Sequence, residues 1–215
     1  MIFRIDLKIF IFLILFYFTR QIKIYSVIML FAIIHEFSHL LAGILLGMKV
    51  KKVSLMPMGL SIEFKLTQND YNKKVLKSNK LEIKRIIVAI AGPLVNIVLI
   101  FIIKLLSVPV EIKQVMIYSN IIIAIFNLIP IYPLDGGRIL KSTLSLLVNK
   151  KNASIYINKI SNIILFILTF IFSLLIYNYQ NIALLIMLIY LWYIVLKENK
   201  IYKSKIRIYK IIETL

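Results

Sequence analysis

The sequence contains no cysteine and only two histidines among its 215 residues. The lack of cysteine excludes disulfide bonds, and it also excludes thiolate ligands for a metal ion. Acidic residues are scarce too, with nine Asp and Glu against 27 Lys and Arg, for a formal net charge of +18. A site that needs imidazoles or carboxylates must therefore be built from very few side chains, and each can be considered individually.

Apolar residues are what the sequence has in abundance, at 61% of the chain with a mean hydropathy of +0.92. Because the hydrocarbon core of a bilayer takes roughly 20 helical residues to cross, recurring apolar runs exclude a soluble protein. The fold class expected is an all-α polytopic membrane protein. About six transmembrane helices are predicted, at residues 7–18, 24–46, 86–106, 115–129, 155–177 and 182–196.

The basic residues gather between these apolar runs. Residues 49–85 hold ten Lys and Arg against three acids, and the stretch from 197 holds six against two. Such loops anchor to an anionic cytoplasmic leaflet, so both termini are expected in the cytoplasm. A nucleic-acid binder would carry its cations in a stripe interleaved with aromatics, so no nucleic-acid partner is expected. No small-residue cleavage site follows residues 1–18, which predicts a retained first span rather than a signal peptide.

The longest polar segment contains an alternating pattern. Residues 50–55 and 60–66 alternate apolar with polar side chains, and the stretch between them holds a Pro and a Gly. This pattern predicts a β-hairpin within residues 49–66, lying at the membrane surface. Residues 67–80 are rich in Asn and Lys and are expected to form a disordered basic loop.

Both histidines of the chain lie in one motif, His35-Glu36-Phe37-Ser38-His39. On a helix, positions i and i+4 share a face, so both imidazoles can reach one zinc ion. Glu36 then lies close enough to take a proton from a zinc-bound water without being a ligand. Chance placement of two histidines would give this spacing about once in 100. The motif predicts a zinc site in which Glu36 is the catalytic base.

A catalytic zinc ion usually holds three protein ligands, so a third donor is needed. Among the nine acids, Asp135 is the one flanked by apolar residues, prolines and glycines at the end of an apolar run. We choose Asp135 as the third ligand. The alternative is that Asp135 caps a helix that begins at Gly136.

A Gly-Pro pair and an Asn interrupt the apolar run at residues 86–106. Polar groups and helix breakers inside a span usually face protein or a water-filled cavity. Asn96 is therefore a candidate for the site. The alternative is a helix kink at Pro93, with Asn96 forming a hydrogen bond between helices, and the sequence leaves both readings open.

These motifs, taken together and in this order, resemble the site-2 protease family of intramembrane zinc proteases. The resemblance rests on the histidine motif, on Asn127, Pro130 and Asp135 at the end of a later span, and on the Gly-Pro…Asn element between them. It implies that His35, His39 and Asp135 bind one zinc ion and that Glu36 activates a water. It also implies that Asn127 holds the substrate or its oxyanion, and we group Pro130 and Asn96 with it as substrate-site residues.

Within that family the chain resembles the branch of stage IV sporulation protein FB. The branch implies cleavage of the pro-sequence of a sporulation sigma factor at the bacterial cytoplasmic membrane, with small membrane proteins as inhibitors. The domains expected are a first transmembrane segment at 1–23, a protease core with a three-helix catalytic centre at 24–150, two spans at 151–197, and a basic cytoplasmic tail at 198–215 without a CBS domain.

Three alternatives to this function stay open. The protease could act on another membrane-anchored regulator. Intramembrane His and carboxylate groups also mark ion pathways, so a metal transporter subunit is the second alternative. A catalytically silent scaffold would be expected to lack a ligand residue, and every expected ligand is present. Self-association into a homo-oligomer is also left open.

Overall fold

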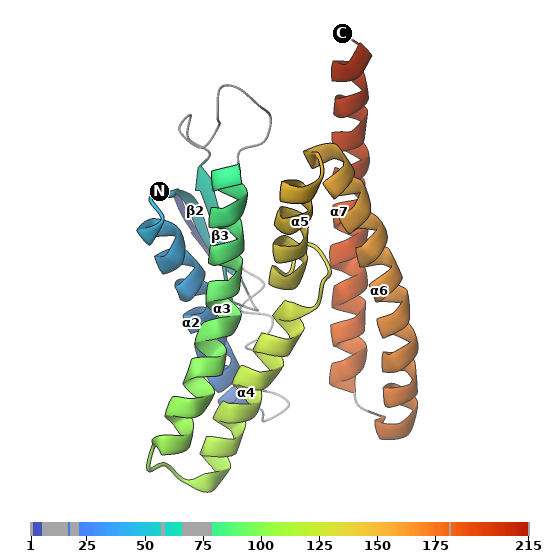
Figure 1. Ribbon diagram of the computed structural model, residues 1–215. Coiled ribbons are helices and arrows are strands. Elements are labelled where there is room, and N and C mark those ends of the chain that lie inside the picture. Colours follow the sequence, from blue (N-terminus) through green and yellow to red (C-terminus); the bar gives the residue numbers. More distant parts are fainter. Residues whose placement is uncertain are drawn as a thin grey trace. The chain divides into compact units, whose positions relative to one another are not determined.

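The computed structural model describes residues 2–5, 17, 22–56, 59–65, 79–180 and 182–214 (Figure 1). These residues form two compact units, Met1–Asn127 and Leu128–Leu215. The elements in chain order are β1 (Ile2–Ile5), α2 (Ile22–Leu45), β2 (Lys49–Met56), β3 (Gly59–Lys65), α3 (Asn79–Leu105), α4 (Val110–Leu128), α5 (Asp135–Leu147), α6 (Lys150–Tyr179) and α7 (Ile182–Thr214).

Four helices in the described part of the chain are long and apolar enough to cross a membrane: α2, α3, α4 and α6. They coincide with four of the six predicted spans, and the protein is a multi-pass membrane protein. Of the predicted span at 7–18, only Tyr17 lies within the described residues. The predicted span at 182–196 is the first half of α7. Its 15 apolar residues rise only about 22 Å as a helix, which is short of a hydrocarbon core of about 30 Å.

The first unit carries a three-stranded sheet in the order β1-β2-β3. Strands β2 and β3 pair antiparallel, with Val53 opposite Ile62 and Met56 opposite Gly59. They lie where the alternating pattern predicts strands. Strand β1 pairs with β2 in parallel. Residues 2–5 are therefore a sheet strand, although they fall in the segment 1–23 for which a transmembrane helix was expected. The four-residue strand ends before the apolar run at 7–18.

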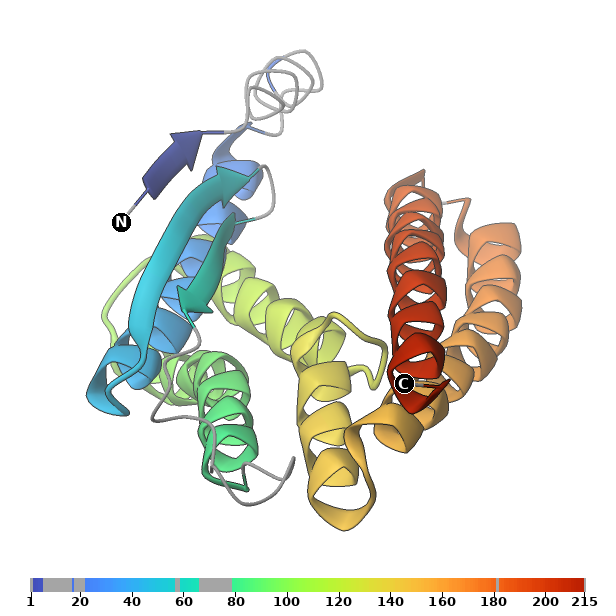
Figure 2. The same cartoon turned by 90° about the horizontal axis from the view of Figure 1, so that it is seen from above.

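The aromatic side chain of Phe64 packs the sheet against α2. Figure 2 shows β2 and β3 running alongside α2. The ring of Phe64 on β3 occupies the space where a side chain at Gly43 would lie. Phe64 also packs against a buried apolar cluster made by Met48, Leu81 and Val88. The glycine on α2 thus lets an aromatic ring of the sheet approach the helix that carries the histidines.

Helix α3 begins at Asn79, seven residues before the predicted span at 86–106. Leu81 is 1% exposed and belongs to the apolar cluster with Met48. The neighbouring Glu82 is buried and accepts a 2.8 Å hydrogen bond from Arg85. Burial of Leu81 favours an early start of the helix in a stretch whose composition is typical of a loop. The prediction of a disordered loop is therefore wrong at its C-terminal end, at residues 79 and 80.

The second unit consists of α5, α6 and α7. Helices α6 and α7 lie side by side, and α5 packs against the start of α6 (Figures 1 and 2). Asn158 of α6 donates to the side chain of Asn199 on α7, and Trp192 donates to Thr169. Helix α7 continues without a break through the basic residues to Thr214, so 198–214 is helical. Lys and Arg are good helix formers, which allows this continuation.

Candidate metal centre

The two histidines are buried on one face of α2, at 1% and 2% exposed surface. The Nε2 atoms of His35 and His39 lie 3.2 Å apart. The two rings are nearly perpendicular, with their centroids 4.8 Å apart. The spacing of four residues therefore brings the two imidazoles together as the motif predicts, with the same nitrogen of each ring facing the other.

Helix α3 supplies the partner of each remaining ring nitrogen. The Nδ1 of His39 lies 2.6 Å from the backbone oxygen of Val88, and the Nδ1 of His35 lies 2.5 Å from Oδ1 of Asn96. A carbonyl oxygen can only accept, so each Nδ1 carries the proton and donates it. In the neutral ring the other nitrogen then has no proton. Both Nε2 lone pairs face each other.

Two facing lone pairs 3.2 Å apart are suited to a metal ion. Nitrogen ligands at about 2.0–2.1 Å from a tetrahedral zinc ion lie roughly 3.3–3.4 Å from one another. The separation in α2 is close to that value, and hydrogen bonding of Nδ1 to oxygen is the usual support of a zinc-bound histidine. The separation of the two Nε2 atoms therefore fits a zinc ion.

Gly92 of α3 lies directly against both rings. A Cβ atom at this position would be 2.5 Å from Cε1 and Nε2 of His39 and 2.7 Å from Cε1 of His35. Carbon atoms do not approach each other this closely, so any side chain here would displace the imidazoles. Gly92 thus makes room for the histidines, and α3 continues through Pro93 to Leu105.

Asp135 is the first residue of α5 and is 3% exposed. The N-cap position belongs to Leu134, and no side-chain hydrogen bond caps the helix. The alternative role of Asp135 as a helix cap is therefore wrong. Its carboxylate lies 3.6 Å from a guanidinium nitrogen of Arg138, which is one turn later and half exposed. A neighbouring cation favours the ionised form of a carboxylate, which is the form that binds metal.

The loop before Asp135 is held from two directions. The main chain at Gly136 and Gly137 packs so closely against the backbone of residues 128–132 that neither position has room for a Cβ atom. The glycine pair therefore permits a close approach of the two backbone segments. On the other side, Ser161 of α6 accepts a 3.0 Å hydrogen bond from the backbone N–H of Tyr132. Asp135 therefore begins its helix from a fixed turn.

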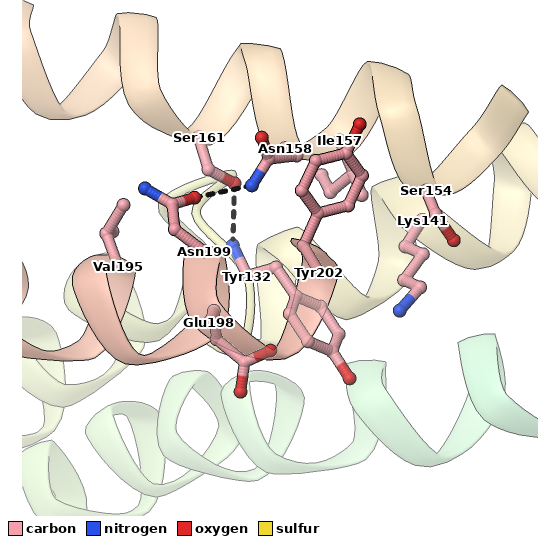
Figure 3. A pocket seen from close by; sticks show the side chains of 10 residues that line it. All are labelled: Tyr132, Lys141, Ser154, Ile157, Asn158, Ser161, Val195, Glu198, Asn199 and Tyr202. Carbon is pink, nitrogen blue, oxygen red and sulfur yellow. Dashed lines mark hydrogen bonds between the residues drawn. The ribbon is translucent and has the colours of Figure 1, made fainter. Parts of the chain in front are cut away.

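Figure 3 shows the pocket in which Ser161 meets Tyr132. The residues that line it come from α5, α6, α7 and the loop before α5. The ammonium group of Lys141 lies 4.1 Å from the centre of the Tyr132 ring, which adds a cation–π contact. The pocket thus adjoins the turn that leads to Asp135.

The other predicted site residues are placed as follows. Glu36 is half buried on α2, next to His35. Asn127 is half buried near the end of α4, and one N–H of its amide donates to the backbone oxygen of Ile123 at 3.0 Å. Pro130 is half buried in the connection between α4 and α5. Asn96 is fully buried against His35, a placement that favours a role in orienting the ligand over the substrate contact predicted for it.

Two residues at the histidines were missed as site residues. Asn120 of α4 is fully buried and accepts a 2.8 Å hydrogen bond from the amide of Asn96. The available signal was an Asn within an apolar run, which is the same signal that singled out Asn96. The sequence indicates Gly92 only as part of a helix-breaking Gly-Pro pair. It does not show that Gly92 contacts the histidine rings.

Among the described residues, His35, His39 and Asp135 are the buried side chains that could hold a metal ion. The sequence profile of peptidase family M50 matches residues 24–111 and 106–172, which make up more than half of the chain. The chain belongs to peptidase family M50. This is the site-2 protease family of membrane zinc metalloproteases, and two imidazoles with one carboxylate are a donor set of catalytic zinc.

Stage IV sporulation protein FB of Bacillus subtilis is 31% identical over 126 residues, which are 57% of this chain and 40% of that protein. A zinc metalloprotease of Methanocaldococcus jannaschii is 32% identical over 120 residues, or 53% of this chain and 32% of that protein. The chain thus matches less than half the length of these M50 relatives. The solved site-2 protease from Methanocaldococcus jannaschii has the same fold, with a TM-score of 0.64 at 21% identity over 90% of this chain and 88% of that one.

Proposed function

We propose that this M50 protein is an intramembrane zinc endopeptidase, with a core at residues 24–150 that cleaves a membrane-associated protein within or near the bilayer. The observation that carries the proposal is the buried histidine pair, whose Nε2 lone pairs face each other at 3.2 Å with both Nδ1 protons committed to oxygen. His35, His39 and Asp135 would be the three protein ligands. When bound, zinc supplies a water of pKa about 7 and polarises the scissile carbonyl.

Glu36 acts as the general base and then as the acid. Its carboxylate takes one proton from the attacking water, and the remaining hydroxide adds to the carbonyl carbon of the substrate. The same proton then passes to the amide nitrogen as the C–N bond breaks, so atoms and charge balance. A half-buried carboxylate suits this cycle, because it must exchange a proton with water in an otherwise apolar span.

Asn127 stabilises the oxyanion that forms during the attack. One of its two amide N–H groups donates to Ile123, and the second remains for a substrate oxygen. Pro130 follows in the connection to α5, where its ring cannot continue a helix. An unwound substrate must satisfy its backbone groups at membrane depth, and we assign Asn127 and Pro130 to that contact.

The substrate class proposed is the membrane-associated pro-sequence of a sporulation sigma factor, and another membrane-anchored regulator is the alternative. The likeness to stage IV sporulation protein FB supports the first choice. The basic segments between spans support a bacterial cytoplasmic membrane with both termini inside. Small inhibitory membrane proteins and self-association belong to the same proposal.

Co-expression with candidate substrates tests the function. The natural chain should shorten the substrate on a gel, and Glu36→Gln should retain zinc but abolish cleavage. Ser38→Ala is the matched control, because Ser38 lies in the same motif and its hydroxyl donates only to the backbone of Ile34. Full activity of Glu36→Gln would contradict the proposal. Metal uptake into proteoliposomes without any cleavage would favour a transporter.

A further inference from the structure

A chain of three hydrogen bonds runs from α4 through α3 to the histidine helix. The side chain of Asn120 donates to the backbone oxygen of Met116 at 2.9 Å. Asn96 donates to Oδ1 of Asn120 at 2.8 Å, and the Nδ1 of His35 lies 2.5 Å from Oδ1 of Asn96. Both Asn side chains are fully buried. No water is therefore needed to complete the chain.

The direction of every bond in this chain follows from its last acceptor. The backbone oxygen of Met116 can only accept, so Asn120 presents its NH₂ group there and its oxygen to Asn96. Asn96 must then present its own NH₂ group to Asn120 and its oxygen to His35. As a result His35 donates from Nδ1, and its Nε2 keeps the lone pair that a metal ion requires.

The two histidines differ in what fixes their tautomer. His39 is fixed by the backbone oxygen of Val88, which no side-chain substitution removes. The tautomer of His35 depends on the side-chain amide of Asn96. This amide can rotate by 180° and so exchange the positions of its oxygen and nitrogen. In the described part of the chain, the contact with Asn120 opposes that rotation. A rotated Asn96 would donate to Nδ1 of His35, and the proton would then move to Nε2 and block metal binding.

We propose that Asn120 is a positioning residue that holds His35 in its metal-binding tautomer by fixing the orientation of Asn96. The tautomer of His35 does not depend on the proposed protease function. The effect of the tautomer on zinc binding does rest on that function. Partners of metal-bound histidines typically contribute 10–100-fold to metal affinity. Asn120 acts on His35 through Asn96. The effect of Asn120 on the tautomer should therefore vanish when residue 96 carries a carboxylate, whose two oxygens are equivalent.

The test uses the fact that the chain has only two histidines. Nitrogen-15 labelling of histidine, in zinc-free protein purified with a histidine-free tag, gives NMR signals from His35 and His39 alone. The natural chain should show both rings protonated at Nδ1. Asn120→Leu should move the proton of His35 to Nε2, leave His39 unchanged and weaken zinc binding 10–100-fold in chelator competition.

Three further variants separate positioning from a general packing role. Asn120→Asp keeps an oxygen for Asn96 and should retain the natural tautomer. Asn96→Asp offers His35 an oxygen from either end, so Asn120→Leu added to Asn96→Asp should leave His35 protonated at Nδ1. Ser119→Ala is the matched control, since Ser119 is also buried on α4 and donates only to the backbone of Val115.

The outcomes are distinct. An unchanged His35 tautomer in Asn120→Leu would overturn the proposal, and so would an equal effect of Asn120→Leu in the Asn96→Asp background. If Asn120→Leu does not fold, loss of the Nδ1 tautomer in Asn120→Asp would overturn it. A natural chain that binds no zinc but shows the expected tautomers would contradict the proposed function and leave this positioning role intact.

Discussion

Gly92 of α3 lies against the imidazole of His39 so closely that a Cβ atom would be 2.5 Å from two ring atoms. The residue makes no hydrogen bond to the site through a side chain, yet it determines where both rings can lie. The lack of a side chain at Gly92 is therefore as much a requirement of the site as the two histidines are.

Replacing Gly92 with Ala tests this steric role. Alanine is a better helix former than glycine by about 1 kcal/mol, so the helix alone would gain stability. The added methyl group must push the histidine rings apart or aside, and we expect zinc affinity to fall at least tenfold, measured by chelator competition. Leu94→Ala, on the exposed side of the same helix, is the control and should leave zinc affinity unchanged. Unaltered zinc affinity in Gly92→Ala would contradict the close contact.

Ser161 is expected to support zinc binding from a distance. Its hydroxyl accepts the backbone N–H of Tyr132, three residues before Asp135. Ser161→Ala leaves that N–H without its partner, at a cost of about 1–3 kcal/mol where it is buried, and loosens the turn before α5. We predict faster loss of zinc to a chelator, with the histidine signals of the zinc-free protein unchanged.

Ser154→Ala provides the comparison for Ser161→Ala. Ser154 lies on the same helix, lines the same pocket and donates to the backbone of Lys150. Equal zinc release from the two variants would indicate that the bond to Tyr132 has no special part in holding Asp135.

Phe64 is expected to contribute to the stability of the first unit rather than to chemistry. Its ring fills the space at Gly43 and packs on the cluster of Met48 and Leu81. Phe64→Ala should lower the melting temperature in detergent and destabilise the protein by roughly 2–3 kcal/mol, less than a fully buried Phe because the side chain is partly exposed. Phe37 lies on α2 and is 52% exposed, so Phe37→Ala should lower the melting temperature far less. A loss of zinc without a change in stability would argue against this structural role.

The helices that cross the membrane could be predicted from apolar runs because lipid imposes both a length and a composition. The early start of α3 could not, since it depends on Leu81 meeting Met48, a residue more than 30 positions away in the sequence. The short helix α5 was anticipated only in the alternative in which Asp135 caps a helix that begins at Gly136. Its apolar residues recur at helical spacing, but its start at Asp135 follows from a turn packed against Gly136 and Gly137, a contact that the sequence does not show.

The group of His35, His39 and Asp135 was accessible to sequence reasoning because the chain has so few histidines and acids that each position carries information. The supporting residues were not. Asn96 was a candidate, but the sequence does not show whether its side chain binds the substrate or another part of the protein. The contact with His35 shows that it binds the protein. Asn120 lies in no recognisable motif. The contact of Val88 is made by its backbone oxygen, which every residue type has, so the sequence carries no sign of it.

X-ray absorption at the zinc edge, together with metal content, measures the central claim most directly. The purified Glu36→Gln protein should contain one zinc per chain, with two imidazole nitrogens at about 2.0–2.1 Å and the remaining ligands oxygen. His39→Ala should lose one imidazole shell and most of the metal. A protein that contains no zinc after purification in zinc-supplemented buffer, or a zinc environment without two imidazoles, would contradict the account.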